Sequence, residues 1–361
     1  MPGGAGYFGG WSGLRRFWGF LLVVLLGTAG ILQILGPQTL GPQTLGPRHP
    51  PGAPGPEPVA SPAIPPAPIV VHPAPPPAAL RDDKPGRAVP GPIADPDPAL
   101  QEFVAGSTTD ALPAVAADGR KPMRHYAAGF DPTTTRPRIG VLVAGIGLSY
   151  ADSKKAIADL PGGVSLAISP YTDNAEPLLA SARLAGHEYL LSLPMEPQRF
   201  PLNDAGPKAL MTNLSPQQNQ PRLIWALSRL RGYAGVTDIL GAMRGERLAD
   251  VPDQMAPILA ELNRRGLMYV AGPGQKAPVP QTWSKAVDLV IDDPATAADI
   301  DARLATLEQM ARDRGAALGL IEAPRPVAIE RLAAWTNGLS NRGLALAPVS
   351  ALMLPPEDKP K

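Results

Sequence analysis

Between Ile139 and Ala347 the chain alternates short apolar segments with longer segments of helical character, and this alternation limits the possible folds more than any other feature. Strands that alternate with helices pair in parallel, because each helix carries the chain back to the same edge of the sheet. The expected strands are 139–143, 164–168, 188–193, 235–240, 267–271, 287–291, 318–321 and 344–347. Eight such strands predict an α/β domain that forms a distorted (β/α) barrel.

Helices are expected at 149–160, 174–186, 215–230, 252–265, 295–314 and 327–339. The clearest helix start is Ser215-Pro216-Gln217-Gln218, a capping box with proline at the first helical position. Gly186 is expected to end the helix before it, because glycine readily adopts the left-handed conformation of a helix end.

The chain before this domain has a different composition. About a third of the residues from Gly36 to Pro98 are proline, including the repeat GPQTL-GPQTL, and such a segment cannot form a packed core. We therefore expect a Pro-rich, disordered and irregular linker over 36–137, the folded domain over 138–354 and a short tail over 355–361. The linker is expected to act as a spacer, and recognition of its prolines by a partner is the alternative.

Residues Phe17–Leu35 are apolar over the length that a bilayer requires. Arg15 and Arg16 precede this segment and no basic residue follows until Arg48, so the positive-inside rule predicts that residues 1–16 lie in the cytoplasm. A cleaved signal peptide is the alternative, although no clean Ala-x-Ala site is present. We expect a single-pass inner-membrane protein with its C-terminal domain in the periplasm.

Composition excludes several kinds of function. The chain has no cysteine, which removes disulfides, thiolate nucleophiles and cysteine-ligated zinc. Its net charge of +1 and the absence of a basic patch with interleaved aromatic residues argue against nucleic-acid binding.

The segment Gly186–Pro197, GHEYLLSLPMEP, contains several candidate site residues. Pro194 ends the expected strand and places Glu196 at its carboxyl end, which is the edge where parallel α/β domains bind ligands. His187 and Glu188 have two interpretations: they either fix the turn before the strand or take part in a site.

Several segments in this order resemble the divergent polysaccharide deacetylase family. They are 139–147 (IGVLVAGIG), 166–170, GHEYLLSLPMEP, Gly206-Pro207, 235–241, 265–270, 287–292, 324–326 and 347–350. The resemblance implies a distorted barrel of the glycoside hydrolase/deacetylase type. It also implies a divalent metal held by Asp and His, which polarises an N-acetyl carbonyl and activates water.

The residues that the resemblance assigns to this chemistry are replaced. The Asp-Asp pair corresponds to Ala144-Gly145, and a histidine before Leu-Pro corresponds to Ser192. A later histidine corresponds to Ile239, a strand-end aspartate to Ala271-Gly272, and a Gly-His-Pro motif to Glu322-Ala323-Pro324. His187 is the only histidine of the expected domain, so we expect no metal site and no cofactor.

Acidic residues remain at the expected carboxyl ends of strands. Glu196, Asp238 and Glu322 are candidate catalytic residues, because two carboxylates across a cleft can perform glycosidase-type acid–base chemistry. Asp292 and Asp293 are alternatively explained as a cap for the helix that follows Pro294. The expected binding cleft consists of His187, Glu188, Ser192, Glu196, Asp238 and Asp292.

The leading hypothesis is a membrane-anchored envelope protein whose deacetylase-like domain no longer deacetylates and instead binds a glycan, such as peptidoglycan or another envelope polysaccharide, or a partner protein. An active carbohydrate hydrolase or deacetylase with a rebuilt carboxylate site is the second hypothesis. A protein-docking scaffold is the third.

Overall fold

The computed structural model describes residues 89–107, 109–277 and 282–356, all within one compact unit of residues 75–361. The expected membrane anchor, 17–35, and most of the expected linker lie outside these residues. Within the described ranges, no helix is long and apolar enough to cross a membrane.

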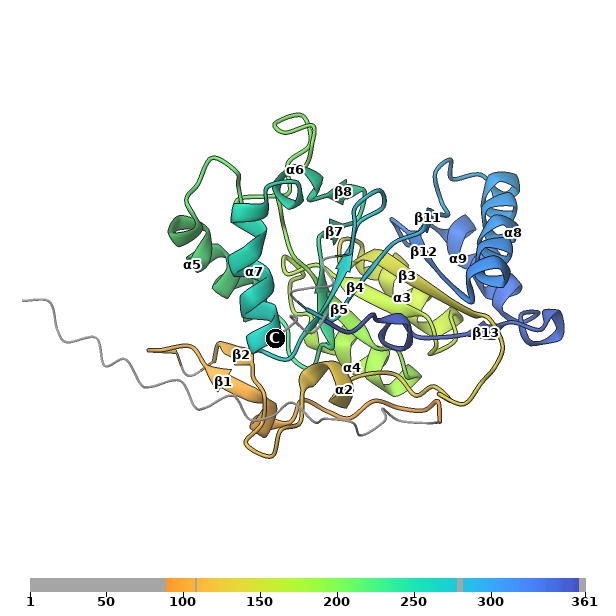
Figure 1. The fold of residues 1–361 in the computed structure, drawn as a ribbon, viewed down its shortest axis with the longest axis horizontal. Coiled ribbons are helices and arrows are strands. Elements are labelled where there is room, and N and C mark those ends of the chain that lie inside the picture. The colour runs from red at the N-terminus through yellow and green to blue at the C-terminus, as the bar shows by residue number, and fades with distance from the viewer. Residues whose placement is uncertain (1–88, 108, 278–281, 357–361) are drawn as a thin grey trace, which may run out of the picture. The chain divides into compact units, whose positions relative to one another are not determined.

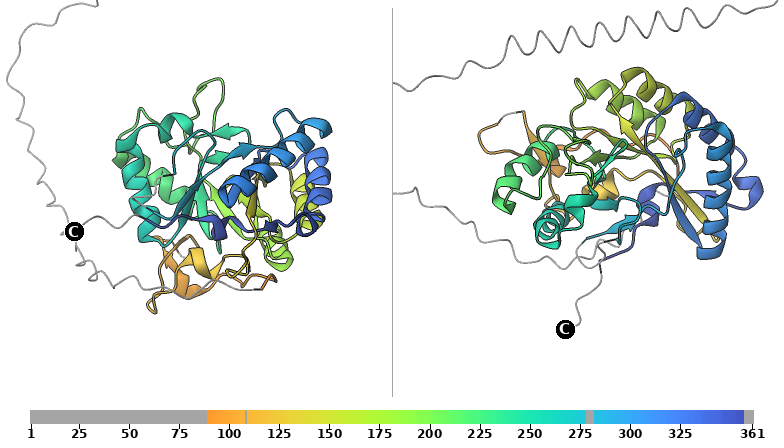
Figure 2. Two further views of the ribbon diagram at one scale, coloured as in Figure 1. Left: turned by 45° about the vertical axis from the view of Figure 1, so that its right-hand side comes forward. Right: turned by 90° about the horizontal axis from the view of Figure 1, so that it is seen from above.

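A curled parallel sheet forms the centre of the domain, consistent with a (β/α) barrel (Figure 1; Figure 2). Every strand pair in it is parallel, and β13 also pairs with β3. In spatial order the strands are β10 (Ser284–Ala286), β9 (Met268–Ala271), β6 (Gly235–Thr237), β5 (Tyr189–Ser192), β4 (Ser165–Ile168), β3 (Arg138–Ile146), β12 (Ala316–Ile321) and β11 (Leu289–Val290), with β13 at Ala345–Leu346.

These strands match the expected ones with two differences. Strand β10 was not expected, since Ser-Lys-Ala is not an apolar sequence. The expected strand 235–240 divides at Asp238 into β6 and β7 (Ile239–Leu240), and β7 forms an antiparallel hairpin with β8 (Met243–Arg244). The hairpin contacts β3 and β4, so it lies over the carboxyl ends of the central strands.

Helices cover one face of the sheet and bury their apolar sides against it. They are α3 (Tyr150–Asp159), α4 (Glu176–Ala185), α5 (Pro216–Leu227), α7 (Pro252–Arg264), α8 (Ala297–Arg314) and α9 (Pro326–Thr336), with the short α6 (Glu246–Ala249) after β8. The capping box at Ser215 and Gln218 is confirmed. Gly186 ends α4 in the left-handed conformation, as expected.

The opposite face of the sheet, here called the inner face, is covered by the segment before β3. Ile93, Leu100, Met123 and Tyr126 are buried there against strand residues that include Leu142. The segment contains η1 (Pro98–Leu100), the hairpin β1 (Gln101–Phe103) and β2 (Ala111–Pro113), and α2 (Pro122–His125), at the amino ends of the strands (Figure 1). Residues before the expected domain start at 138 therefore contribute to the core on this face of the sheet.

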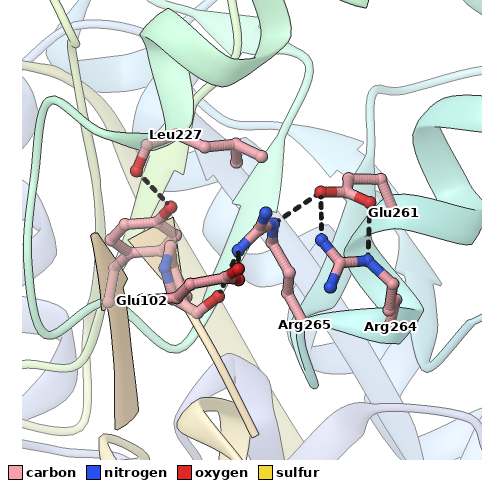
Figure 3. A network of polar contacts seen from close by, with 7 residues as sticks. Glu102, Leu227, Glu261, Arg264 and Arg265 are labelled. Atoms are coloured by element: carbon pink, nitrogen blue, oxygen red, sulfur yellow. Dashed lines mark hydrogen bonds and ion pairs between the residues drawn. The ribbon is translucent and has the colours of Figure 1, made fainter. Parts of the chain in front are cut away.

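Arg265 connects this N-terminal segment to the helical layer (Figure 3). Its guanidinium donates to the Pro113 carbonyl at 2.7 Å and to Glu261 at 2.6 Å, and it lies 3.4 Å from the Glu102 carboxylate. Arg264 binds the same Glu261 carboxylate through two hydrogen bonds. A buried guanidinium with several acceptors joins the β1–β2 hairpin to the end of α7.

Glu188 connects the N-terminal segment to the C-terminal residues Val349–Leu352, which also cover the inner face. It directly precedes β5, and because side chains alternate along a strand it faces the same side as Leu190 and Ser192. Its buried carboxylate accepts hydrogen bonds from the Ala128 backbone N–H, the Ser165 hydroxyl, and both the backbone N–H and the hydroxyl of Ser350. One carboxylate therefore joins the N-terminal segment, β4, β5 and η3 (Val349–Leu352).

We predict that Glu188→Gln lowers the free energy of unfolding of the full chain by about 2–4 kcal/mol, because an amide offers one acceptor oxygen to donors that now share two. Chemical denaturation checks this. The matched control is Glu330→Gln on the exposed side of α9, which is expected to change stability by less than about 0.5 kcal/mol. An equally small effect of Glu188→Gln would contradict the role given to this carboxylate.

Candidate functional site

The acids expected at the carboxyl edge of the sheet lie there in two groups. Glu196 follows β5 and Asp238 follows the neighbouring β6. Asp292 and Glu322 follow the neighbouring strands β11 and β12. Strands β4 and β3 separate the two groups, and the β7–β8 hairpin leads from Asp238 towards Glu322. We call this edge the rim.

Asp238 is buried, and only one of its two carboxylate oxygens has a hydrogen-bond partner. Its Oδ2 accepts from the Gln275 side chain at 2.6 Å, whereas its Oδ1 has no hydrogen-bond partner. A Cβ on Gly272 would lie 3.4 Å from both carboxylate oxygens, so the backbone after β9 packs closely against this group. Burial raises the pKa of Asp238 to about 6, and the Gln275 hydrogen bond only partly opposes this.

The Tyr269 hydroxyl is a second unsatisfied group near Asp238. It is buried and has no hydrogen-bond partner. Burial raises its pKa well above the usual value, and the nearby Asp238 carboxylate adds to the effect. Asp238 and Tyr269 therefore place an acceptor and a donor, neither fully used, between β6 and β9.

Glu322 and Arg244 form the connection across the rim. The Arg244 Nε atom lies 3.4 Å from Glu322 Oε1 and 3.1 Å from Glu246 Oε1. Neither Arg244 Nε nor Glu322 Oε1 makes a hydrogen bond of acceptable geometry, and both atoms are buried. Burial raises the pKa of Glu322, Arg244 lowers it, and Asp292 and Asp293 raise it further.

Asp292 and Glu196 are held by partners of their own. Asp292 accepts from the backbone N–H groups of Glu322 and Ala323 and pairs with Arg325 at 3.1 Å. Burial raises its pKa and these partners oppose the shift. Glu196 accepts from the Thr212 N–H and hydroxyl at 2.6 Å each, and Arg247 lies 3.2 Å from its other oxygen. Both carboxylates therefore hold neighbouring loops in place: Glu196 binds the loop at Thr212, and Asp292 binds the turn after β12.

His187 and Glu188 do not lie with the rim acids, whereas Ser192, Glu196, Asp238 and Asp292 of the expected cleft lie at the carboxyl edge. His187 and Glu188 precede β5, and its four residues at about 3.3 Å each separate them from the rim. The His187 ring nitrogens lie 2.8 Å from the Val164 carbonyl and 3.2 Å from the Ile157 carbonyl. Burial lowers the His187 pKa. Of the two interpretations, the structure favours the one in which this pair fixes the turn.

Unsatisfied polar atoms are concentrated at the rim. Six buried side-chain atoms in the described residues lack a hydrogen-bond partner. Four lie at the rim: Ser192 Oγ, Asp238 Oδ1, Arg244 Nε and Glu322 Oε1. Tyr269 OH lies near Asp238, and Ser284 Oγ belongs to the neighbouring edge strand β10. Native proteins satisfy most buried polar atoms, so a cluster of exceptions calls for an explanation such as a ligand. Sequence analysis did not predict Arg244, Tyr269 or Gln275, because no motif contains them.

Backbone and apolar atoms fill the positions where the resemblance places metal ligands. Ala144, Ile239 and Ala271 are completely buried in the hydrophobic cores. Gly145 has a left-handed φ of 73°, and a Cβ there would lie 3.0 Å from the Glu322 carbonyl oxygen. Gly241 of the hairpin turn packs against Gly145 in turn. In the described ranges, no three His, Asp or Glu side chains are grouped closely enough to hold a metal ion.

A parallel β/α sheet with its unsatisfied polar groups at the carboxyl ends defines the class of barrel-like α/β proteins that carry their sites at this edge. Residues 141–353 match the family model described as divergent polysaccharide deacetylase. This is more than half of the 361 residues, so the chain belongs to the divergent polysaccharide deacetylase family, as its motifs indicated.

Two solved structures are similar to this chain. An uncharacterized protein from Agrobacterium tumefaciens C58 has 29% sequence identity and a TM-score of 0.62, over 67% of this chain and 99% of that one. A putative cellobiose-phosphate cleavage protein from Enterococcus faecalis V583 has 12% identity and a TM-score of 0.42, over 61% of this chain and 100% of that one. The second value is too low to support a conclusion. No curated protein matches the sequence.

We predict that the titration of Asp238 lowers the free energy of unfolding by about 1–3 kcal/mol as the pH rises from 4 to 7. Its folded pKa of about 6 exceeds the ordinary value of 3.8. The native state therefore binds more protons in this interval, and stability decreases as pH rises through it. Denaturant titrations of the full chain and of Asp238→Asn should differ by this pH-dependent amount.

The control for this titration is Asp173→Asn, which alters an exposed aspartate. Its stability should follow the pH dependence of the unmodified protein. An Asp238→Asn variant that keeps the same pH dependence as the unmodified protein would contradict the raised pKa.

Proposed function

We propose that this protein is a non-catalytic member of its family that binds an envelope glycan at the rim. The observation that carries the proposal is the combination of absent metal ligands with unsatisfied polar groups at the same edge. Residues 17–35 would anchor the protein in the inner membrane, and residues 36–88 would span part of the distance from the membrane to the glycan. At about 3.1 Å per residue, an extended Pro-rich segment reaches well over 100 Å.

The loss of deacetylation is supported by how the rim is built. A metal-dependent deacetylase needs a set of ligands that converges on one point and leaves an open coordination position. Here Ala144, Ile239 and Ala271 are core residues, and the Gly145 and Gly241 turns pack against each other and the Glu322 carbonyl. Changing one residue back to aspartate or histidine would not recreate a ligand set.

Glycan binding is supported by the chemistry of the unsatisfied groups. Sugar hydroxyls both donate and accept hydrogen bonds, and the rim offers a donor in Arg244 and acceptors in Glu322 and Asp238. The Arg244 side chain is 30% exposed and the Glu322 side chain is 12% exposed, so a ligand in solution can reach this pair. Leu148 and Tyr150, both more than half exposed, follow β3 at the same edge.

We predict that the full chain in detergent co-sediments with isolated peptidoglycan and releases no acetate from it. Arg244→Gln should weaken the binding at least fivefold, because it removes a charged donor from the rim. The control is Arg199→Gln, an exposed arginine in the loop that follows the LPMEP sequence, which should bind normally. Binding that is unaffected by Arg244→Gln, or the absence of binding, would contradict the proposed site.

A second candidate function, an active carbohydrate hydrolase, is favoured by the raised pKa values of Asp238 and Glu322. Carboxyl groups with a raised pKa suit proton donation to a leaving group. Cleavage or deacetylation of the glycan by the full chain, abolished by Glu322→Gln or Glu196→Ala without unfolding, would establish this function and exclude the first.

A further inference from the structure

A cavity of about 240 Å³ lies at the amino ends of the strands, at the end of the sheet opposite to the rim. Its walls come from the loop after α2, the start of β3, the residue before β10 and the η3 segment. Water occupies about 30 Å³ per molecule in the liquid, so this space accommodates a small organic molecule. No residue of the rim lines it.

Two arginines line this cavity, and neither has a carboxylate partner within the described part of the chain. Arg138 at the start of β3 donates one hydrogen bond, to the Ala351 carbonyl at 3.0 Å. Arg124 of α2 lies over the Trp283 ring, with 4.9 Å from its guanidinium carbon to the ring centroid. A guanidinium has five N–H donors, so most of the donors of this pair remain available.

One carboxylate, that of Glu188, lies behind the cavity wall. It binds Ala128 and Ser350, which both line the cavity, and it is itself fully buried. Its oxygens already accept four hydrogen bonds from neutral donors. The Asp131 carboxylate, between Phe130 and Pro132, accepts two hydrogen bonds from Thr133 and is not among the residues that line the cavity. The lining therefore contains two arginines and no carboxylate.

Apart from Ser350, the other lining residues have apolar or aromatic side chains. The largest are Phe130, Trp283 and Met353. A ligand that fits must place an anionic group on the guanidinium groups and an apolar body against these side chains, because an anion alone would leave the aromatic walls without contacts.

We propose that this cavity is a second binding site, which takes a small organic carboxylate. The carboxylate accepts hydrogen bonds from Arg124 and Arg138, since a guanidinium matches the two oxygens of a carboxylate. The apolar part of the ligand contacts the aromatic side chains of Phe130 and Trp283. This site is independent of the rim and of its proposed glycan binding.

Calorimetric titration of the full chain with benzoate and with benzamide tests the proposal. Benzamide has nearly the same shape without the charge. We expect saturable one-to-one binding of benzoate, at least tenfold weaker binding of benzamide, and weaker benzoate binding as the salt concentration increases. Comparable affinity for the two compounds, or no saturable benzoate binding, would overturn the proposal without any use of variants.

The variant Arg124→Gln should weaken benzoate binding at least tenfold, and its thermal unfolding should remain cooperative because no ion pair or side-chain hydrogen bond of Arg124 is broken within the described residues. The matched control is Arg136→Gln, which removes the same charge from an exposed position two residues before Arg138. It should bind benzoate normally. Equal loss in both variants would show a general charge effect and overturn the site, whereas loss of rim glycan binding alone leaves the cavity proposal intact.

Discussion

The packing of both chain ends against the sheet depends on the hydrogen bonds of the buried Glu188 carboxylate. Burying a charge is costly unless hydrogen bonds replace its hydration, and four donors from three segments do so here. Ala128 precedes the sheet in sequence and Ser350 follows it, so a single group fixes both covers of the inner face. The position of Glu188 at the amino end of β5 also leaves the opposite end of that strand free to carry Ser192 and Glu196.

We propose that this domain keeps a deacetylase-like fold without the metal chemistry that the family resemblance implies. The parallel sheet has its helices on one face and its acids at the carboxyl ends of the strands. The ligand positions have become core residues or tight backbone contacts, such as Gly145 against the Glu322 carbonyl. The remaining carboxylates are spread over two groups, and several have partners that fix loops. These features support the proposal that the site recognises a polar ligand.

Much of the fold could be predicted from the sequence because its determinants are local. The capping box at Ser215, the left-handed Gly186 and the branched apolar strands each depend on a few adjacent residues. The packing of the N-terminal segment on the inner face could not be predicted. Ile93 and Leu100 are buried there, but the sequence around them is as rich in proline as the expected linker.

The site was predicted less completely. The position of the rim acids followed from where the strands end, but their partners are distant in sequence. The β7–β8 hairpin brings Arg244 close to Glu322, and no sequence motif predicted this hairpin. The role of Glu188 likewise depends on Ser350, 162 residues away, and a contact over this distance leaves no pattern in the sequence around Glu188.

The central claim is that this domain has no metal site, and the most direct test is calorimetric titration of the full chain, produced without a histidine tag, with zinc. The account predicts no saturable binding at micromolar metal and no stoichiometric metal in the purified protein, because the rim offers no converging ligand set within the described residues. Tight one-to-one binding of zinc would contradict it.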